Sequence, residues 1–235
     1  MRVKGFIDTS FVDWDGKIVS TVFVSRCNFR CPFCFNHNLI LHPERYPNVP
    51  DSIITGFMGR NRDFLDGVCI TGGEPTLARD LKDFCRSAIS LGMKVKLDTN
   101  GSRPDVLSKL VSDGLVNYVA MDIKAPPDDR SYSRAIGVKS AGILDSVMKS
   151  VSFLMDSDMD YEFRTTVVPS LHSEGDIQEI AKWIQGARSY VLQKFRPENA
   201  WRRSLRRLSP QKDSEMEGLV MIAGKYVNNV KWRGR

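Results

Sequence analysis

The sequence predicts an α/β fold built on a parallel β-sheet, in a single domain of residues 1–235. Short apolar, β-branched runs alternate along the chain with stretches whose apolar residues recur at helical spacing. Strands separated by amphipathic helices form right-handed βαβ units, and the strands of such units run parallel. Six units are fewer than the eight of a closed barrel, so we expect an open (β/α)6 partial barrel.

The predicted β/α core occupies residues 17–195. Its strands cover residues 17–26, 67–71, 93–99, 116–123, 161–168 and 190–195. The helices expected between them cover residues 51–60, 77–91, 104–113, 141–155 and 175–187. Proline suits the first turn of a helix and glycine its end, so Pro104, Gly92 and Gly114 support these bounds.

Residues 196–235 are expected to form a C-terminal loop and a closing helix. Apolar residues recur at helical spacing between residues 213 and 230, and this helix would cover the open edge of the sheet. The loop before it contains Trp201 and four arginines, Arg202, Arg203, Arg206 and Arg207. Such a segment could dock an acidic protein surface or a nucleic-acid phosphate, but a solvated charged segment is the commoner case.

Three cysteines follow the first predicted strand at the spacing C-x3-C-x2-C: Cys27, Cys31 and Cys34. Thiolates this close can converge on one soft metal centre, and three of them on a [4Fe-4S] cluster leave one iron open to a substrate. His37 lies three residues beyond the last of them, so a structural Cys3His zinc site is the rival interpretation. Cys69 and Cys85 fall in apolar segments and are expected in the core.

Further polar residues and glycines lie at or just beyond the ends of the other predicted strands. They are Gly72, Gly73, Glu74, Asp98, Asn100, Asp122, Lys124 and Arg164. The carboxyl ends of parallel strands form the ligand-binding edge of α/β sheets, so we expect these residues to line one site. Simpler roles stay open, namely a Gly-Gly turn, an Asn-Gly turn at Asn100 and a surface ion pair for Arg164.

Together these motifs resemble the radical S-adenosylmethionine (SAM) superfamily. The resemblance rests on the cysteine motif with Phe33 in it and on the Gly-Gly-Glu-Pro run at residues 72–75. Leu-Asp-Thr-Asn-Gly at residues 97–101 and Met-Asp-Ile-Lys at residues 121–124 resemble the activating enzymes of glycyl-radical enzymes. The similarity covers roughly residues 5–200. Those activating enzymes usually have His-Asn after the third cysteine, where Phe35-Asn36 stands here, and this departure concerns the substrate.

The resemblance implies a parallel-sheet partial barrel with a [4Fe-4S] cluster on Cys27, Cys31 and Cys34, and SAM bound beside it. It implies that Gly72, Gly73 and Glu74 contact the methionine amino group of SAM. Lys124 would meet the SAM carboxylate, Arg164 is a second candidate for that carboxylate or for the ribose, and Asp98 and Asp122 would flank a monovalent cation. The remaining cofactor-contacting residues that it implies are Phe33, Phe35 and Asn100. A SAM contact by His172 stays open.

The implied function is reductive cleavage of SAM to a 5′-deoxyadenosyl radical that generates a glycyl radical on a partner enzyme. Anaerobic ribonucleoside-triphosphate reductase is the first candidate partner, and a flavodoxin- or ferredoxin-type protein would supply the electron. A radical SAM enzyme acting on a small molecule, similar to the 7-carboxy-7-deazaguanine synthases, is the alternative. A zinc-stabilised basic binding module is the third.

Composition favours a cytoplasmic protein without a membrane or nucleic-acid partner. The net charge of +6 is too modest to indicate nucleic-acid binding. No stretch approaches the roughly 18 apolar residues of a membrane span, and charges stand where a secretory segment would be apolar. Five cysteines, an odd number, fit a reducing compartment.

Overall fold

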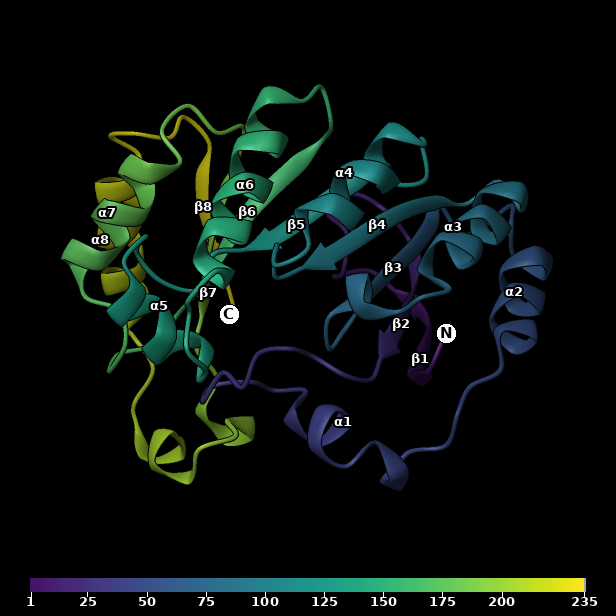
Figure 1. Cartoon of the computed structure of the whole chain (residues 1–235), viewed down its shortest axis with the longest axis horizontal. Helices are drawn as coiled ribbons and strands as arrows, with labels where there is room; N and C mark the ends of the chain where they lie inside the picture. The colour runs from purple at the N-terminus through teal and green to yellow at the C-terminus, as the bar shows by residue number, and fades with distance from the viewer. Residues whose placement is uncertain (235) are drawn as a thin grey trace. The chain divides into compact units, whose positions relative to one another are not determined.

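A computed structural model describes residues 1–234, and its helices and strands are labelled in Figure 1. The fold is α/β, with an eight-stranded, mostly parallel sheet whose strands are ordered as in the chain, β1 to β8. The predicted fold class is confirmed. The chain forms two compact units, and each is described by itself. Unit 1 consists of Met1–Asn28, Asn36–Thr99 and Asp105–Ala120, and unit 2 of Phe29–Phe35, Asn100–Pro104 and Met121–Arg235.

Unit 1 contains four strands: β1 (Val3–Ser10), β2 (Val19–Val24), β3 (Gly67–Gly72) and β4 (Lys94–Thr99). β2, β3 and β4 pair in parallel, with Val24 opposite Gly72 at their carboxyl ends. The residues that follow β2 and β3 therefore leave the sheet at the same edge, as predicted. β1 was not predicted and pairs antiparallel with β2. Most of its side chains are partly or fully exposed, so its sequence lacks the alternation that marks a half-buried strand.

Helices pack around these strands in unit 1. They are α1 (His37–Leu41), α2 (Asp51–Arg60), α3 (Leu81–Ser90) and most of α4 (Pro104–Ser112), with short 3-10 turns at Pro43–Arg45 and Pro75–Leu77. α3 buries its apolar face, and burial raises the pKa of the Cys85 thiol to about 12. Cys69 in β3 is buried against Trp14 and Val19. Both cysteines predicted for the core are confirmed there.

Unit 2 contains β6 (Tyr161–Val167), β7 (Tyr190–Lys194) and β8 (Val230–Arg233), all parallel. β5 (Tyr118–Asp122) is the strand in which the chain passes from unit 1 to unit 2. The helices of unit 2 are α5 (Asp129–Ile136), α6 (Ile143–Asp156), α7 (Glu174–Trp183) and α8 (Asp213–Ala223), and α7 and α8 pack against each other (Figure 1). α7 begins at a capping box formed by Ser173 and Asp176, which satisfies backbone donors of its first turn.

The C-terminal segment differs from the prediction. The expected helix over residues 213–230 ends at Ala223, and residues 230–233 form β8, which pairs with β7. A strand therefore takes the edge position that we assigned to the helix. Gly224 is the C-cap of the helix, and the turn-forming Asn-Asn pair at residues 228–229 comes directly before β8. Val227 fits the helical spacing in the sequence, but it is buried in the segment between α8 and β8.

α5 was also missed, because it is short and mostly polar and follows a Pro-Pro pair at residues 126–127. It ends at Gly137, whose left-handed backbone forms the C-cap. In residues 1–234 no helix has both the length and the apolar character that crossing a bilayer requires.

Candidate active site

The cysteine loop follows β2, and residues 29–35 of it belong to unit 2. Cys31 is buried and Cys34 is partly exposed, and the Cys34 N–H donates to the Cys31 carbonyl at 3.1 Å in a tight turn. All five cysteines lie in the described chain, and none forms a disulfide. Cys27, the first of the motif, belongs to unit 1 and is partly exposed.

Two other segments of unit 2 fix the cysteine loop. The Arg30 N–H donates to the carbonyl of Ile136 at the end of α5, at 2.7 Å. Gly137 follows directly, and a Cβ there would lie 2.0 Å from the Arg30 carbonyl oxygen, so only glycine allows this approach. On another part of the loop, the Arg202 N–H donates to the Pro32 carbonyl at 2.9 Å. The backbone around Cys31 is thus held from both α5 and the segment after β7.

A largely buried charged group lies in unit 2 where β5 and β6 end. Lys124 Nζ donates to one carboxylate oxygen of Asp122, and Arg164 Nε donates to the other, both at 2.8 Å. Burial alone would raise the pKa of Asp122, but the charges of Arg164 and Lys124 outweigh it and hold that pKa at about 2. We call these three residues the charged triad. The surface ion pair that the sequence left open for Arg164 is wrong in one respect, because the Arg164 side chain is buried and only its partner Asp122 is partly exposed.

The charged triad lies beside the cysteine loop. The Phe33 ring centroid is 5.8 Å from Lys124 Nζ, a cation–π distance. Burial alone would lower the pKa of Lys124, but Asp122 and the nearby Cys31 raise it above its ordinary value, so Lys124 is charged at neutral pH. Two cations, the buried Arg164 and the partly buried Lys124, face one carboxylate, so the triad has an excess positive charge. This arrangement can bind an anionic group such as a ligand carboxylate.

His172 positions the chain next to Lys124. Its Nδ1 accepts from the Val168 N–H at 3.0 Å, so the proton is on Nε2, which donates to the Lys124 carbonyl at 2.8 Å. Burial lowers the pKa of the ring, and the histidine is therefore neutral. Both ring nitrogens are used by the backbone of unit 2, which gives His172 a structural role.

The Gly-Gly-Glu run of unit 1 packs against the backbone that leads from β2 to Cys27. The Gly73 N–H donates to the Val24 carbonyl and the Glu74 N–H to the Arg26 carbonyl, each at 2.8 Å. A Cβ on Gly73 would lie 1.8 Å from the Arg26 carbonyl oxygen, and Gly72 has a φ of 114°. Both glycines are therefore required by this close approach, whether or not a ligand binds.

Sequence reasoning missed Asn36 as a supporting residue. Its side-chain amide donates to the Gly72 carbonyl at 3.0 Å and so ties the residue after the cysteine loop to β3. The sequence did contain a signal for Asn36. The activating enzymes usually have His-Asn after the third cysteine, and Asn36 matches the asparagine of that pair. The neighbouring Phe35, which stands for the histidine, is exposed.

The other expected contact residues already have partners in their own units. Glu74 is buried, and its Oε1 accepts from the Thr76 N–H, the Thr76 hydroxyl and the Thr99 hydroxyl at 2.6–3.1 Å. Asp98 lies 3.4 Å from the buried Lys96 ammonium. Asn100 Oδ1 accepts from the Ser102 N–H at 2.9 Å, an Asx turn. Their contacts with a cofactor stay predictions.

Among residues 1–234, no three His, Cys, Asp or Glu side chains are grouped closely enough to hold a metal ion. Both the three-cysteine cluster site and the rival zinc site with His37 therefore rest on donor type and spacing. Of the predicted residues, unit 2 brings together Cys31, Phe33 and the charged triad, and unit 1 brings together the Gly-Gly-Glu run and the backbone before Cys27.

Comparison with known proteins separates these interpretations. Residues 21–184 match the model of the radical SAM superfamily. The chain is 34% identical over 233 residues to the "Putative glycyl-radical enzyme activating enzyme MJ1227" of Methanocaldococcus jannaschii, covering 97% of this chain and 94% of the relative. It is 30% identical over 101 residues to the 7-carboxy-7-deazaguanine synthase of Thermoplasma acidophilum, covering 43% of this chain and 44% of that protein.

A solved structure agrees at the level of the fold. The crystal structure of Streptococcus suis SuiB bound to S-adenosylmethionine aligns with a TM-score of 0.66 at 17% identity, over 89% of this chain. The chain spans only 48% of the length of SuiB. The family model covers well over half of the chain, and it matches the segment that contains the cysteine motif, the Gly-Gly-Glu run and the charged triad. The chain is a radical SAM enzyme and belongs to the radical SAM superfamily.

Proposed function

We propose that this enzyme activates a glycyl-radical enzyme by generating a glycyl radical on it. The observation that carries the proposal is the charged triad, whose excess positive charge lies next to Cys31 and Phe33 in one unit. An anion-binding group beside a proposed cluster ligand would suit the carboxylate of a SAM molecule bound next to the cluster. The similarity along nearly the whole chain to a protein named as an activating enzyme supports the choice of reaction.

The residues present fit the cofactors of the family, a [4Fe-4S] cluster and SAM. Cys27, Cys31 and Cys34 supply the thiolates that iron–sulfur clusters prefer. Once bound, such a cluster would supply the electron for reductive cleavage of SAM to a 5′-deoxyadenosyl radical. Lys124 and Arg164 would pair with the methionine carboxylate. The backbone at residues 72–74 would receive the methionine amino group.

The surrounding residues of unit 2 prepare these contacts. Asp122 holds Lys124 and Arg164 in fixed positions, and His172 fixes the backbone of Lys124, so the cations are oriented before a ligand arrives. The Phe33 ring lies over the Lys124 ammonium at a cation–π distance and so adds a further contact to it. A monovalent cation at Asp98 and Asp122 finds less support, because both oxygens of Asp122 already accept from cations.

A glycine of a partner protein is a suitable substrate. Removal of its α-hydrogen leaves a radical delocalised over two flanking amide groups, and no Cβ blocks close approach. We propose anaerobic ribonucleoside-triphosphate reductase as the partner and a flavodoxin- or ferredoxin-type protein as the electron donor. A reducing cytoplasm is the compartment that an oxygen-labile cluster needs.

The test is anaerobic incubation of the reconstituted enzyme with SAM, dithionite and the candidate reductase, followed by electron paramagnetic resonance. We expect a glycyl doublet with the wild-type enzyme and with Cys69→Ala, a control that changes a core cysteine only, and none with Cys34→Ala. SAM cleavage that a small metabolite stimulates, without a doublet on any glycyl-radical protein, would instead support the small-molecule alternative. The partial similarity to 7-carboxy-7-deazaguanine synthase makes its substrate class the first to try.

A further inference from the structure

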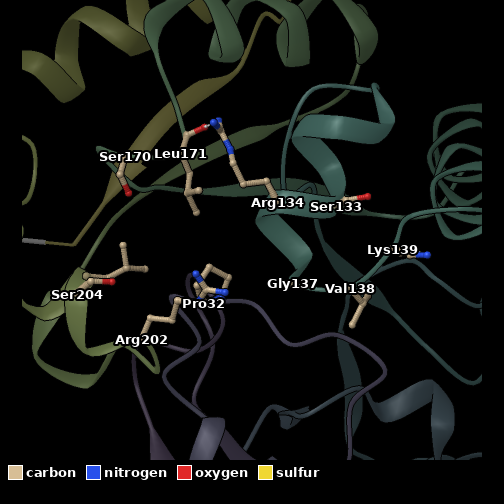
Figure 2. Close-up of a pocket in the computed structure, with 11 residues that line it drawn as sticks. Pro32, Ser133, Arg134, Gly137, Val138, Lys139, Ser170, Leu171, Arg202 and Ser204 are labelled. Atoms are coloured by element: carbon tan, nitrogen blue, oxygen red, sulfur yellow. Dashed lines mark hydrogen bonds between the residues drawn. The ribbon is translucent and has the colours of Figure 1, made fainter.

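We infer that a pocket of unit 2 beside Pro32 docks a small acidic one-electron carrier protein that reduces the cluster. The pocket has a volume of about 690 Å³ and is formed by the cysteine loop, α5 with the residues after it, the segment after β6 and the segment after β7 (Figure 2). It contains none of the residues of the charged triad. The inference rests on the proposed cluster at the three cysteines.

The pocket touches the cysteine loop directly. Pro32 lines it and lies in the sequence between Cys31 and Cys34. The next residue, Phe33, instead faces Lys124 of the charged triad. Neighbouring side chains of the loop thus face the pocket and the charged triad separately. A protein in the pocket would contact the backbone that carries two thiolates without occupying the anion-binding group.

The pocket is positively charged. Arg134, Lys139 and Arg202 line it, and none of its described lining residues is acidic. The adjoining segments contain acidic residues that do not line the pocket, namely Asp128, Asp129, Glu174, Asp176 and Glu198. Residues 203–207 continue the positive surface with three further arginines on a 3-10 helix. The arginine segment noted in the sequence therefore adjoins a structured pocket.

The arrangement of charge and apolar surface suits a protein better than a small anion. The three cationic residues are exposed, and the Arg134 guanidinium already donates to the Leu171 carbonyl at 3.0 Å, so they do not converge on one buried point. Pro32 and Leu205, both buried, add apolar surface. An apolar centre with a charged rim is the usual anatomy of a protein interface. Electron carriers use small, weak interfaces of this kind and are steered by charge.

The carrier protein alone supplies the one electron that the cluster would gain. A flavodoxin hydroquinone would give up one electron and become a semiquinone, or a ferredoxin would be oxidised by one electron, and the cluster would gain that electron. Flavodoxins and ferredoxins are acidic, so either is complementary to the rim of Arg134, Lys139 and Arg202. Charge steering would raise the association rate and make it depend on salt.

The test compares two charge-reversal variants of the reconstituted enzyme. Lys139→Glu/Arg202→Glu changes the pocket, and the backbone N–H of Arg202 that donates to Pro32 remains. Lys149→Glu/Lys225→Glu is the matched control, because it makes the same change in net charge at exposed positions outside the pocket. Binding of oxidised flavodoxin is measured by calorimetry at low and high salt, with a ferredoxin as a second arm.

We expect Kd for flavodoxin, ferredoxin or both to rise about tenfold or more in the pocket variant and about twofold or less in the control. SAM cleavage driven by the same reduced carrier should fall in the pocket variant, while cleavage driven by dithionite should stay at the wild-type rate. Equal Kd values in the two variants would refute the docking site. If the pocket variant does not fold, Lys139→Gln/Arg202→Gln replaces it and should show a smaller loss of carrier affinity. A wild-type Kd that does not change with salt concentration would also refute the docking site. If the reconstituted wild-type enzyme does not cleave SAM with dithionite, the proposed cluster chemistry is refuted instead.

Discussion

Replacing Asp122 by asparagine tests whether the charged triad holds unit 2 together. The carboxylate accepts from Lys124 and Arg164 at 2.8 Å each, and the side chains of these two cations are only 13% and 9% exposed. Lowering its pKa from 3.8 to about 2 corresponds to a contribution on the order of 2 kcal/mol at neutral pH. Removing one partner of a buried ion pair costs about 3–5 kcal/mol, because the remaining charges lose their compensation.

We therefore expect Asp122→Asn to lower the free energy of unfolding by about 3 kcal/mol at pH 7. The assay is urea denaturation of the cluster-free chain followed by circular dichroism, so that metal binding does not contribute. Asp160→Asn is the control, because that carboxylate is 76% exposed and lies 3.7 Å from Arg188. An exposed pair of this kind contributes about 0–1 kcal/mol.

The pH dependence gives an independent check on the same residue. The folded state holds the pKa of Asp122 below its unfolded value, so its contribution is present above about pH 4 and is lost as pH falls through about pH 2. The difference in stability between wild type and Asp122→Asn should narrow over that window. A loss at pH 7 within about 0.5 kcal/mol of the control, or a gap that does not narrow in acid, would refute the account of the triad.

Three further predictions concern the cofactor residues and the glycines. Cys31→Ala should prevent binding of the roughly four irons and four sulfides expected per chain, whereas Cys85→Ala should retain them and cost at most a few kcal/mol of stability, as iron and sulfide assays can show. Lys124→Ala should weaken SAM binding to the reconstituted enzyme by about 1.5–3 kcal/mol, and equal affinities by calorimetry would remove Lys124 from the site. Gly73→Ala should destabilise unit 1 by about 2 kcal/mol or more, because its Cβ would lie 1.8 Å from a backbone carbonyl oxygen, whereas Gly175→Ala at the start of α7, with its nearest contact at 3.7 Å, should be neutral or stabilising in the same denaturation assay.

The sequence allowed the fold class and most of the β/α series to be predicted, because buried parallel strands and amphipathic helices have distinct apolar patterns. The prediction missed the elements whose apolar patterns are weak. β1 is a strand with mostly exposed side chains, β8 has four residues, and α5 is short and polar. Their positions depend on pairing and packing with other segments, which no local pattern contains.

Candidate site residues could be located because functional side chains follow strand ends, but their partners could not be read from the chain. Asp122 and Lys124 are two residues apart, and a shared face of one strand predicts that they lie close together. The 42-residue separation between Asp122 and Arg164 hides the second ion pair until β5 and β6 are placed. Sequence position therefore showed where the charges lie, and the structure was needed to show how many of them compensate each other.

The glycines before Glu74 show how one motif can satisfy packing and ligand binding together. A Cβ on Gly73 would clash with the Arg26 carbonyl oxygen wherever these two backbone segments pass this close to each other. The glycine is therefore explained by packing, without a ligand. The same approach joins the exit of β3 to the backbone that enters the cysteine loop. If SAM is held by the residues after β3 beside a cluster that includes Cys27, this contact fixes, within unit 1, where residues 72–74 lie relative to the backbone that leads to Cys27. A substitution at Gly73 that the fold tolerates should therefore still weaken SAM binding, and this combination of readouts would separate the two roles.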